Sequence, residues 1–440
     1  MSSVSKRLLT ASVATAALML GYASAGAGSF AIREQGAIGQ GMSFAGAAAG
    51  SAGLASMFWN PATITDNAGW QSSFSVTGVF VDAKETPQIG TSPLLLPLGG
   101  SGQIGQAGMV PSSYNSYQFN DQIWLGLSIN APFGLVTKTK RIWAGAIYGQ
   151  TSKVFSTDIT PTIGYKVNEW LSLGAGLQVE YFKTRLTSRS PVNGQSIAIE
   201  GNDIGVGFTL GATLKPVDGT EIGIGYRSQV KETLEGSLIN FPKIPVFVNI
   251  KSKLTLPDQI TIGLKQRVTD DLTLSAGFEW THWSIFKSFP VVITAGPLNG
   301  ISPTTLGFRY RDGYFASVGA SYRYNEALTL RTGLAFERSP ISDTVRTVRL
   351  PDNDRIWTSI GASYAYNQKL SFDLGYTHIF PKSTSIRINS VANPAFNPAV
   401  PLPYVGKVSA GIDVVSVGLN YRWDDPKVAQ VAVLPIVRKY

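Results

Sequence analysis

Few residues of the chain have the type and spacing that catalysis or metal binding needs. The chain has no Cys and two His, which excludes a thiol nucleophile, a disulfide framework and a cysteine-ligated metal. His282 and Ser284 would face the same side of a strand, but no acid stands at a spacing that completes a hydrolase site. The Gly-rich stretch from Gly36 to Gly41 lacks the Lys-Ser/Thr pair of a phosphate-binding loop. We therefore expect no catalytic residue, no metal, no cofactor and no enzyme.

The composition also argues against a soluble protein. Of 440 residues, 44% are hydrophobic and 15% are charged, against about 25% charged in soluble domains. The formal net charge is +9, from 37 Lys and Arg against 28 Asp and Glu, and the basic residues are scattered. We expect no nucleic-acid partner. A mildly basic solvated surface and a basic lumen or rim that attracts anions both remain open.

The N-terminal residues predict export. Two basic residues precede an apolar run over 8–20, and a small-residue A-x-A site follows. These three features are typical of a secretory signal peptide, and the run is too short to span a bilayer, which takes about 20 residues. We predict a signal peptide over 1–25, cleaved after Ala25 or, alternatively, after Ala27.

A segment rich in small residues follows. Residues 26–53 contain eight Gly and eight Ala, which leaves too little side chain for a core of their own. Such a segment is either a flexible linker or a piece that packs inside something larger, where small residues allow close backbone approach. Phe58 and Trp59 then lead into Asn60-Pro61-Ala62, a turn that is unusual for a linker.

From Trp70 onward the hydrophobic period becomes two. Residues 171–181, 272–280, 314–324 and 328–337 alternate apolar with small or polar side chains, so each strand has one apolar and one polar face. A soluble sandwich would bury the apolar face. Here the polar face is rich in Gly and Ser and the apolar face ends in Tyr and Trp, as expected of a wet lumen and of aromatic girdles in a membrane. Such strands must close into a barrel, because lipid tolerates no unpaired strand edge.

Connection lengths give an independent count of the strands. The expected strands are 70–82, 111–119, 122–133, 151–167, 170–186, 203–215, 219–238, 251–268, 271–288, 311–325, 327–337, 353–367, 369–382 and 406–423. Short turns and long Gly/Pro/Ser-rich connections alternate between them. This predicts an all-β fold, a 14-stranded antiparallel transmembrane β-barrel over 70–423 with its long loops outside. We expect a periplasmic C-terminal extension over 424–440.

Several motifs, taken with their order and spacing, resemble one family. They are Asn60-Pro61-Ala62, Gly225 to Lys231, Leu256 to Asp258, Thr281 to Ser284, Leu328 to Phe336 and Leu350 to Arg355. Over nearly the whole mature chain the sequence resembles the FadL/TodX family of outer-membrane transporters for long-chain fatty acids and other hydrophobic compounds. The resemblance implies a protein of the Gram-negative cell outer membrane, with an N-terminal hatch over 26–69 that plugs the lumen.

The resemblance also implies a transport route. Ligand would enter from outside, pass the hatch by passive diffusion and leave sideways at a kinked third strand. Gly134 matches the kink glycine of the family, although Pro132 and Gly134 also suit a strand that simply ends. Phe58 and Trp59 are candidate lining residues of the hatch beside the gating motif Asn60-Pro61-Ala62, and packing against the wall is the alternative for both aromatics.

The sequence does not determine which head group the ligand has. In fatty-acid members of the family, basic residues near the extracellular end hold the carboxylate, but Ser188 and Pro290 stand where such residues are expected. The basic residues nearby that we consider for this role are Lys183, Arg185, Arg189 and Lys287. The ligand is therefore a fatty acid or a less polar hydrocarbon.

A general outer-membrane porin for small hydrophilic solutes is the alternative function, although a porin has no need of a hatch. The expected partners are a hydrophobic small-molecule ligand, the outer-membrane lipid with its lipopolysaccharide, and detergent in vitro. We expect a monomer, because each closed barrel would contain its own route.

Overall fold

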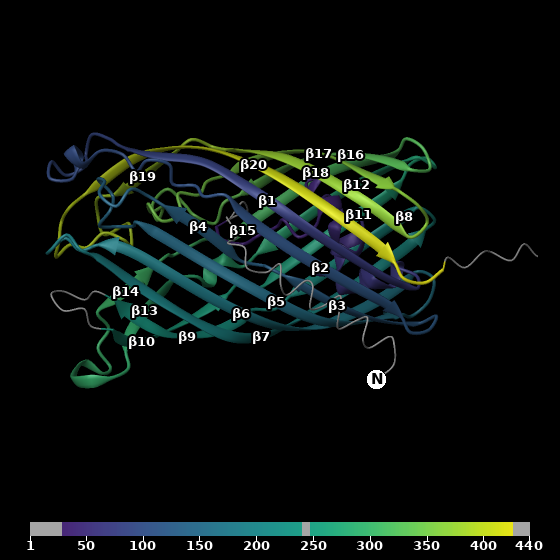
Figure 1. Cartoon of the computed structure of the whole chain (residues 1–440), viewed down its shortest axis with the longest axis horizontal. Coiled ribbons are helices and arrows are strands. Elements are labelled where there is room, and N and C mark those ends of the chain that lie inside the picture. The colour runs from purple at the N-terminus through teal and green to yellow at the C-terminus, as the bar shows by residue number, and fades with distance from the viewer. Residues whose placement is uncertain (1–28, 240–246, 426–440) are drawn as a thin grey trace, which may run out of the picture.

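The computed structural model describes residues 29–239 and 247–425 as an antiparallel β-barrel with residues 29–69 inside it (Figure 1). The signal peptide predicted over 1–25 and nearly all of the predicted extension lie outside the described residues. The wall closes where β1 (Trp70–Pro87) pairs antiparallel with β20 (Tyr404–Arg422) along almost their whole length.

The remaining strands follow one another round the wall. The first are β2 (Gly108–Gln118), β3 (Ile123–Asn130), β4 (Gly134–Lys138), β5 (Thr151–Lys166), β6 (Leu171–Arg189), β7 (Ser196–Val217), β8 (Thr220–Arg227), β9 (Val230–Ile239) and β10 (Val248–Leu256). The others are β11 (Gln259–Arg267), β12 (Leu272–Thr281), β13 (Ser288–Ile293), β14 (Thr304–Gly307), β15 (Gly313–Arg323), β16 (Leu328–Arg338), β17 (Arg355–Ala365), β18 (Leu370–Pro381) and β19 (Thr384–Ile388).

Five wall strands are divided into two pieces each, namely β3 with β4, β8 with β9, β10 with β11, β12 with β13, and β18 with β19. The short strand β14 belongs to a loop and pairs with β13. Counting each divided strand once and leaving out β14 gives fourteen wall strands among the described residues. The predicted 14-stranded barrel is therefore confirmed.

The hairpin of β6 and β7 extends beyond its predicted ends. The two strands pair up to Arg189 and Ser196, so most of the long loop predicted over 187–202 is strand, and that part of the prediction is wrong. A strand needs only about 9–11 residues to cross the bilayer, whereas β6 and β7 have 19 and 22. Above the membrane no side chain faces lipid. The two-residue period of hydrophobicity, which predicts a strand, is therefore lost there.

Apolar side chains cover the outside of the barrel. On β6, Leu173, Leu177 and Val179 are 44%, 51% and 37% exposed, whereas Gln178 and Glu180, at the alternate positions, are buried. The apolar face of the strand therefore points away from the interior and the polar face lines it. This is the reverse of a soluble sandwich and is the arrangement of a membrane-spanning barrel.

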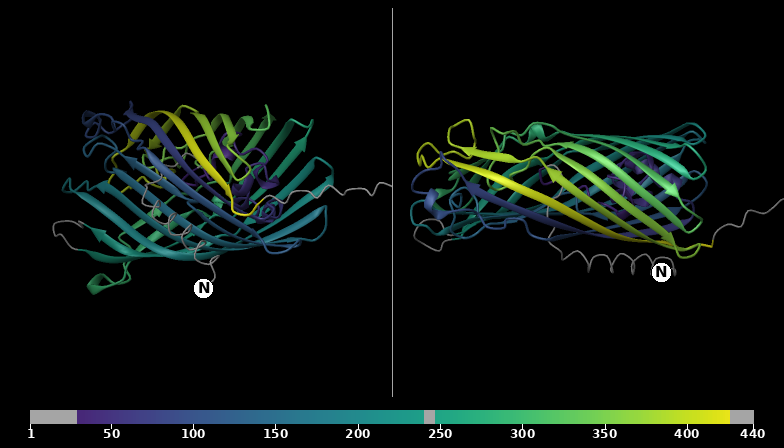
Figure 2. Two further views of the ribbon diagram at one scale, coloured as in Figure 1. Left: turned by 45° about the vertical axis from the view of Figure 1, so that its right-hand side comes forward. Right: turned by 90° about the horizontal axis from the view of Figure 1, so that it is seen from above.

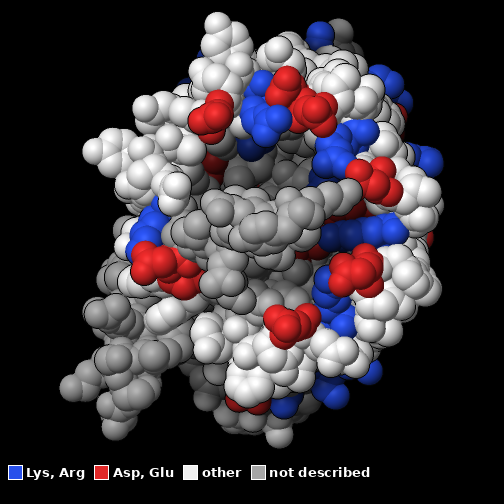
Figure 3. All heavy atoms as spheres, turned by 90° about the vertical axis from the view of Figure 1, so that its right-hand side faces the viewer, with Lys and Arg blue, Asp and Glu red and all other residues white. Residues whose placement is uncertain are grey.

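The short turns lie at one end of the barrel. Asn120, Asn168, Asn325 and Asn367 each accept hydrogen bonds from backbone N–H groups two and three residues further on, a geometry that Asn favours in tight turns. Figure 3 views this end, where basic and acidic side chains alternate round the rim. Three ion pairs of the rim are Lys166 with Glu169, Arg267 with Asp218, and Arg323 with Asp271.

The described hatch residues, 29–69, lie inside the barrel as short helical turns (Figure 2). These are α2 (Ala37–Gln40), η1 (Ala47–Ala49), η2 (Gly53–Phe58) and η3 (Pro61–Asp66); η4 (Leu96–Leu98), η5 (Trp283–Ile285) and η6 (Gly296–Leu298) lie elsewhere in the chain. Glycines on the wall admit the hatch closely: a Cβ on Gly223 would lie 1.7 Å from the carbonyl oxygen of Ala48. None of the helices in the described ranges has the length and apolar character needed to cross a bilayer.

Candidate ligand-binding site and gate

Asn60 joins the hatch to the barrel wall. Its Nδ2 donates to the carbonyl oxygen of Ala48 in the hatch at 2.7 Å and to that of Ala212 on β7 at 3.0 Å. Its Oδ1 accepts the backbone N–H of Ala62 at 3.0 Å, which caps η3. Pro61 then fills the first position of η3, where a missing N–H loses no helical bond. The structure thus places the predicted motif where hatch and wall meet.

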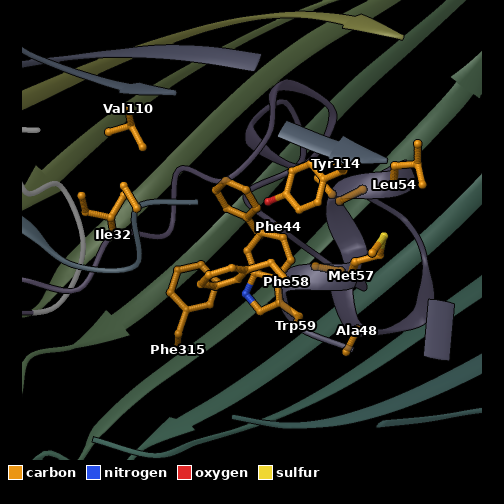
Figure 4. Close-up of a cluster of buried hydrophobic side chains, with 14 of the residues drawn as sticks. Ile32, Phe44, Ala48, Leu54, Met57, Phe58, Trp59, Val110, Tyr114 and Phe315 are labelled. Carbon is orange, nitrogen blue, oxygen red and sulfur yellow. The ribbon is translucent and has the colours of Figure 1, made fainter. Parts of the chain in front are cut away.

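Phe58 and Trp59 lie in the buried aromatic cluster of the hatch (Figure 4). Their ring centroids are 5.1 Å apart, and the guanidinium of Arg227 lies 4.3 Å from the centroid of the Phe58 ring. Arg227 in turn forms a buried ion pair with Asp158 at 2.5 Å. Both aromatics also line a small cavity of about 40 Å³ between the hatch, β6 and β8 to β12. Phe58 thus packs against the wall residue Arg227, and both aromatics line the cavity. Their part in gating stays a prediction.

A second buried ion pair lies beside the first cavity. Arg33 of the hatch makes two contacts with the carboxylate of Glu279 on β12, at 2.5 and 2.7 Å. The neighbouring Glu34 is buried; its Oε2 accepts the backbone N–H of Arg33 at 2.9 Å, and Oε1 has no partner among the described residues. Burial raises the pKa of Glu34 to about 7, so this hatch carboxyl titrates near neutral pH.

The third wall strand is broken next to the hatch. β3 ends at Asn130 and β4 begins at Gly134, and both pieces pair with β5. On the other side, the pairing of β3 with β2 ends at Ile129, and no ladder joins β2 to β4 in the described part of the chain. The residues between the two pieces instead reach the hatch, where Phe133 forms a β-bridge with Ala31.

Three hydrogen bonds close this break with hatch residues. They run from Ile32 N to Pro132 O at 2.8 Å, from Gly134 N to Phe30 O at 2.8 Å, and from Gln35 Nε2 to Ala131 O at 2.9 Å. The wall is therefore interrupted at the position predicted for the kink. Gly134 has no positive φ, so a side chain is compatible with its backbone. Its part in a lateral exit stays a prediction.

An apolar cavity of about 100 Å³ lies on the loop side of the break. Val154, Phe182, Leu234, Phe286 and Phe308 are among the side chains that line it, together with backbone and side chains of the neighbouring strands and loops. A mostly apolar lining with a few polar groups is typical of small-molecule sites.

Phe30 closes the inner side of this cavity. It lines the cavity and contacts four other rings, those of Phe133, Phe182, Trp283 and Phe286, with centroids 4.9 to 6.5 Å away. The next residues, Ala31 to Arg33, line the cavity beside Phe58. Phe30 therefore stands between the two cavities. The sequence does not predict this position of Phe30, because a single aromatic in a Gly/Ala-rich segment carries no periodic signal.

Arg349 supplies the cation of the apolar cavity. It lies in the loop before β17 and lines the cavity beside Thr347 and Leu350. Its Nη1 donates to the carbonyl oxygen of Thr187 at 2.9 Å, and no ion pair joins it to an acid among the described residues. Burial lowers the pKa of Arg349 to about 10, so the side chain is still charged at neutral pH. A half-buried cation that forms no ion pair in the described residues is suited to bind an anionic head group.

The four basic residues predicted for the head group do not line this cavity. Lys183 and Arg185 alternate along β6 with the lining residues Phe182 and Thr184, so they point away from the interior. Arg185 is ion-paired with Glu200 at 2.5 Å. The two others are Arg189, which donates to the carbonyl oxygen of Gly194, and the exposed Lys287.

Comparisons with known proteins agree with this architecture. The family model "Outer membrane protein transport protein (OMPP1/FadL/TodX)" matches residues 17–424. The long-chain fatty acid transport protein of Salmonella typhi is 26% identical over 418 residues, which cover 87% of this chain and 94% of that protein. A 47 kDa outer membrane protein of Pasteurella multocida is 27% identical over 456 residues, or 96% of this chain and 100% of that protein.

Solved structures share the fold. A Pseudomonas aeruginosa FadL homologue has a TM-score of 0.79 at 21% identity, covering 90% of this chain and all of that one. The Ralstonia pickettii toluene transporter TbuX has a TM-score of 0.66 at 19% identity, covering 88% and 98%. With the hatch, the broken third strand and the motif order described above, the family match establishes that the chain belongs to the OMPP1/FadL/TodX family of outer-membrane transport proteins, as its motifs predicted, and is not an enzyme.

Proposed function

We propose that the protein carries long-chain fatty acids across the outer membrane and that Arg349 binds their carboxylate. The observation that supports a fatty acid over a hydrocarbon is a half-buried guanidinium, with no ion pair to an acid in the described residues, at a cavity lined mostly by apolar side chains. A toluene-like ligand would leave this charge without a counterion, which is unfavourable inside a protein. The names of the relatives are consistent with either ligand.

A dry cavity suits such a ligand better than a water-filled pore. Each CH₂ group exposed to water costs about 0.8 kcal/mol, so an alkyl chain partitions into the apolar cavity on the loop side. The hatch fills the lumen below it, and its residues bond directly to the wall. This arrangement argues against the porin alternative, because a porin keeps an aqueous channel open.

Movement of the hatch would open the route inward. Phe30 separates the two cavities, and the hydrogen bonds of Phe30 and Ile32 close the broken third strand. Displacement of Phe30 by an alkyl chain would connect the cavities and uncover the break, through which the ligand leaves sideways into the membrane. Flow is passive and follows the downhill gradient, while Asn60 keeps the rest of the hatch attached.

A monomer is sufficient for this function, because one closed barrel contains the cavity, the gate and the exit. We test the proposal by isothermal titration of purified protein with oleate and with a neutral alkane of equal length. Tight, saturable oleate binding that is lost on Arg349→Gln supports it. Equal binding of the alkane by both proteins would instead assign the cavity to hydrocarbons.

A further inference from the structure

A group of basic side chains lies on the outer surface of the barrel near its loop end. The group consists of Lys153, Lys183, Arg185, Lys231, Lys251 and Lys253 on β5, β6, β9 and β10, and we call it the outer basic patch. Lys183 and Arg185 alternate with cavity-lining Phe182 and Thr184. Lys251 and Lys253 likewise alternate with lining residues of β10. Successive strand residues face opposite sides, so these side chains point toward the surrounding membrane.

The pairing register brings the patch together from strands far apart in sequence. Lys153 is the cross-strand partner of Arg185, and Arg185 is the partner of Glu200 on β7. On the other side of β7, Glu235 is the partner of Lys251. β5, β6, β7, β9 and β10 are neighbours in the wall (Figure 1), and directly opposite side chains lie about 5 Å apart. The patch is therefore one continuous surface.

Positive charge exceeds negative charge on this surface. The six basic residues face two acidic ones, Glu200 and Glu235, which form ion pairs with Arg185 at 2.5 Å and Lys251 at 3.2 Å. Lys183, Lys231 and Lys253 are exposed and form no ion pair within the described residues. Like charges on adjacent strands destabilise a sheet unless something neutralises them, and an excess of four positive charges calls for an anionic partner.

The height of the patch indicates what that partner is. Going toward the loops along the outer face of β6, exposed Val179 is followed by Tyr181, Lys183 and Arg185. On β7 the exposed apolar residues Val206 and Ile204 come first and Glu200 follows at the same level as Arg185. An apolar band, then an aromatic residue, then charge is the order of hydrocarbon, interface and head-group region. The patch therefore lies at the level of the head groups of the outer leaflet.

We propose that the outer basic patch binds the phosphate groups of lipopolysaccharide, the phosphorylated glycolipid of that leaflet. Guanidinium and ammonium groups bind phosphate through charge-assisted hydrogen bonds. The patch lies on the outer surface of the strands that enclose the apolar cavity. Bound glycolipid therefore stiffens β5 to β10 and fixes the depth of the barrel in the membrane. The site is separate from the fatty-acid cavity and does not depend on the identity of the transported ligand.

Native mass spectrometry of the full-length protein in mild detergent tests the proposal. The probe is a rough-type lipopolysaccharide of defined structure, compared with the same glycolipid after enzymatic removal of its phosphates. The test variant is Lys183→Glu/Lys253→Glu. The matched control is Lys84→Glu/Lys407→Glu, which changes two exposed lysines of β1 and β20 by the same charge outside the patch.

We expect the patch variant to lower the affinity for the phosphorylated glycolipid at least about tenfold and the control to change it by no more than about twofold. The dephosphorylated glycolipid should bind the native protein as weakly as the patch variant binds the phosphorylated one. Equal binding of both glycolipids, or an unchanged affinity of the patch variant, would overturn the proposal. Displacement by millimolar inorganic phosphate would contradict the assignment to a lipid.

Folding of the variants is checked by the heat-dependent shift of barrels in gel electrophoresis. If the patch variant does not fold, the affinity of the native protein for the phosphorylated glycolipid is measured at rising salt concentration instead. Binding through phosphate contacts must weaken steadily as ionic strength rises, and affinity that is independent of salt would exclude the patch as the site.

Discussion

The backbone N–H of Gly134 donates a hydrogen bond to the carbonyl oxygen of Phe30 at 2.8 Å. The residue that begins the second piece of the third wall strand is therefore bonded to the hatch residue that separates the two cavities. In the route we propose, the gate and the wall would open together, because moving Phe30 would break the contact that closes the break at Gly134.

Replacing Gly134 with Val should lower oleate uptake while leaving the barrel folded. The backbone at Gly134 has no positive φ, so it puts no strain on Val, and a β-branched residue favours a continuous strand over a break. Uptake of labelled oleate by cells measures the effect. Gly411→Val on β20 is the control, because a Cβ there meets no atom within 4 Å. Uptake by the Gly134 variant at the control level would remove Gly134 from the exit route.

Replacing Arg349 with Gln should weaken oleate binding by about 10- to 100-fold, since hydrogen bonds to charged groups are worth about 1.5–3 kcal/mol. Arg349→Lys should recover part of the affinity, and binding of a neutral alkane should not fall. Lys287→Gln is the matched control, because Lys287 is exposed and does not line the cavity. A larger loss from the Lys287 change would restore the head-group site predicted from the sequence.

Replacing Asn60 with Ala should loosen the hatch without unfolding the barrel. The change removes the bonds to Ala48, Ala212 and Ala62 and leaves buried partners unsatisfied, at a cost of about 2–3 kcal/mol. Hydrogen exchange over residues 47–62 should then accelerate relative to the wall strands. Asn67→Ala, which removes only bonds to the hatch carbonyls of Thr63 and Ile64, is the control, and equal exchange in both variants would refute the anchoring role of Asn60.

The attachment of the hatch should weaken as pH rises from about 5 to about 8. The unfolded Glu34 carboxyl loses its proton near its ordinary pKa of 4.5, whereas the buried carboxyl, with its pKa raised to about 7, keeps its proton longer. Between these values the unfolded state binds fewer protons, so stability falls with rising pH, by about 3 kcal/mol in all. The charged groups that lie close by are Arg33, which is paired with Glu279 at 2.5 Å, and Glu337, which lies 3.9 Å from Arg33.

Hydrogen exchange of the hatch at pH 5 and pH 8 measures this effect. Glu34→Gln should make the exchange rates independent of pH, apart from the intrinsic chemistry of exchange. The control is Glu169→Gln on a periplasmic turn. We expect this variant to keep the pH dependence of hatch exchange that the native protein shows. If the Glu34 variant retains the full pH dependence, another group controls it.

The strand count was predictable because each membrane-spanning strand must alternate between lipid and lumen, so the pattern of residues such as Leu173 and Gln178 is imposed by physics. The hatch was predictable because small residues such as Ala48 must fit against wall glycines. The extension of β6 and β7 at their loop ends was not predictable, because no side chain faces lipid above the membrane and the alternation of apolar and polar residues is no longer required there.

The candidate site was less predictable. Arg349 lies in a loop and Phe30 in a Gly/Ala-rich segment, and only the fold brings them to one cavity. For Lys183 and Arg185 the sequence did contain a pattern that shows which way their side chains point. The apolar face of β6 occupies odd positions up to Tyr181, and continuing that alternation places both basic residues on the outside of the barrel rather than in its lumen.

Uptake of labelled oleate and of sucrose by cells that lack their own fatty-acid transporter tests the transport function most directly. Expression of the native chain should raise oleate uptake in a saturable way and leave sucrose entry at background, because the hatch closes the lumen to water-soluble solutes. Sucrose entry without oleate uptake would contradict a transporter for hydrophobic ligands and favour an open porin.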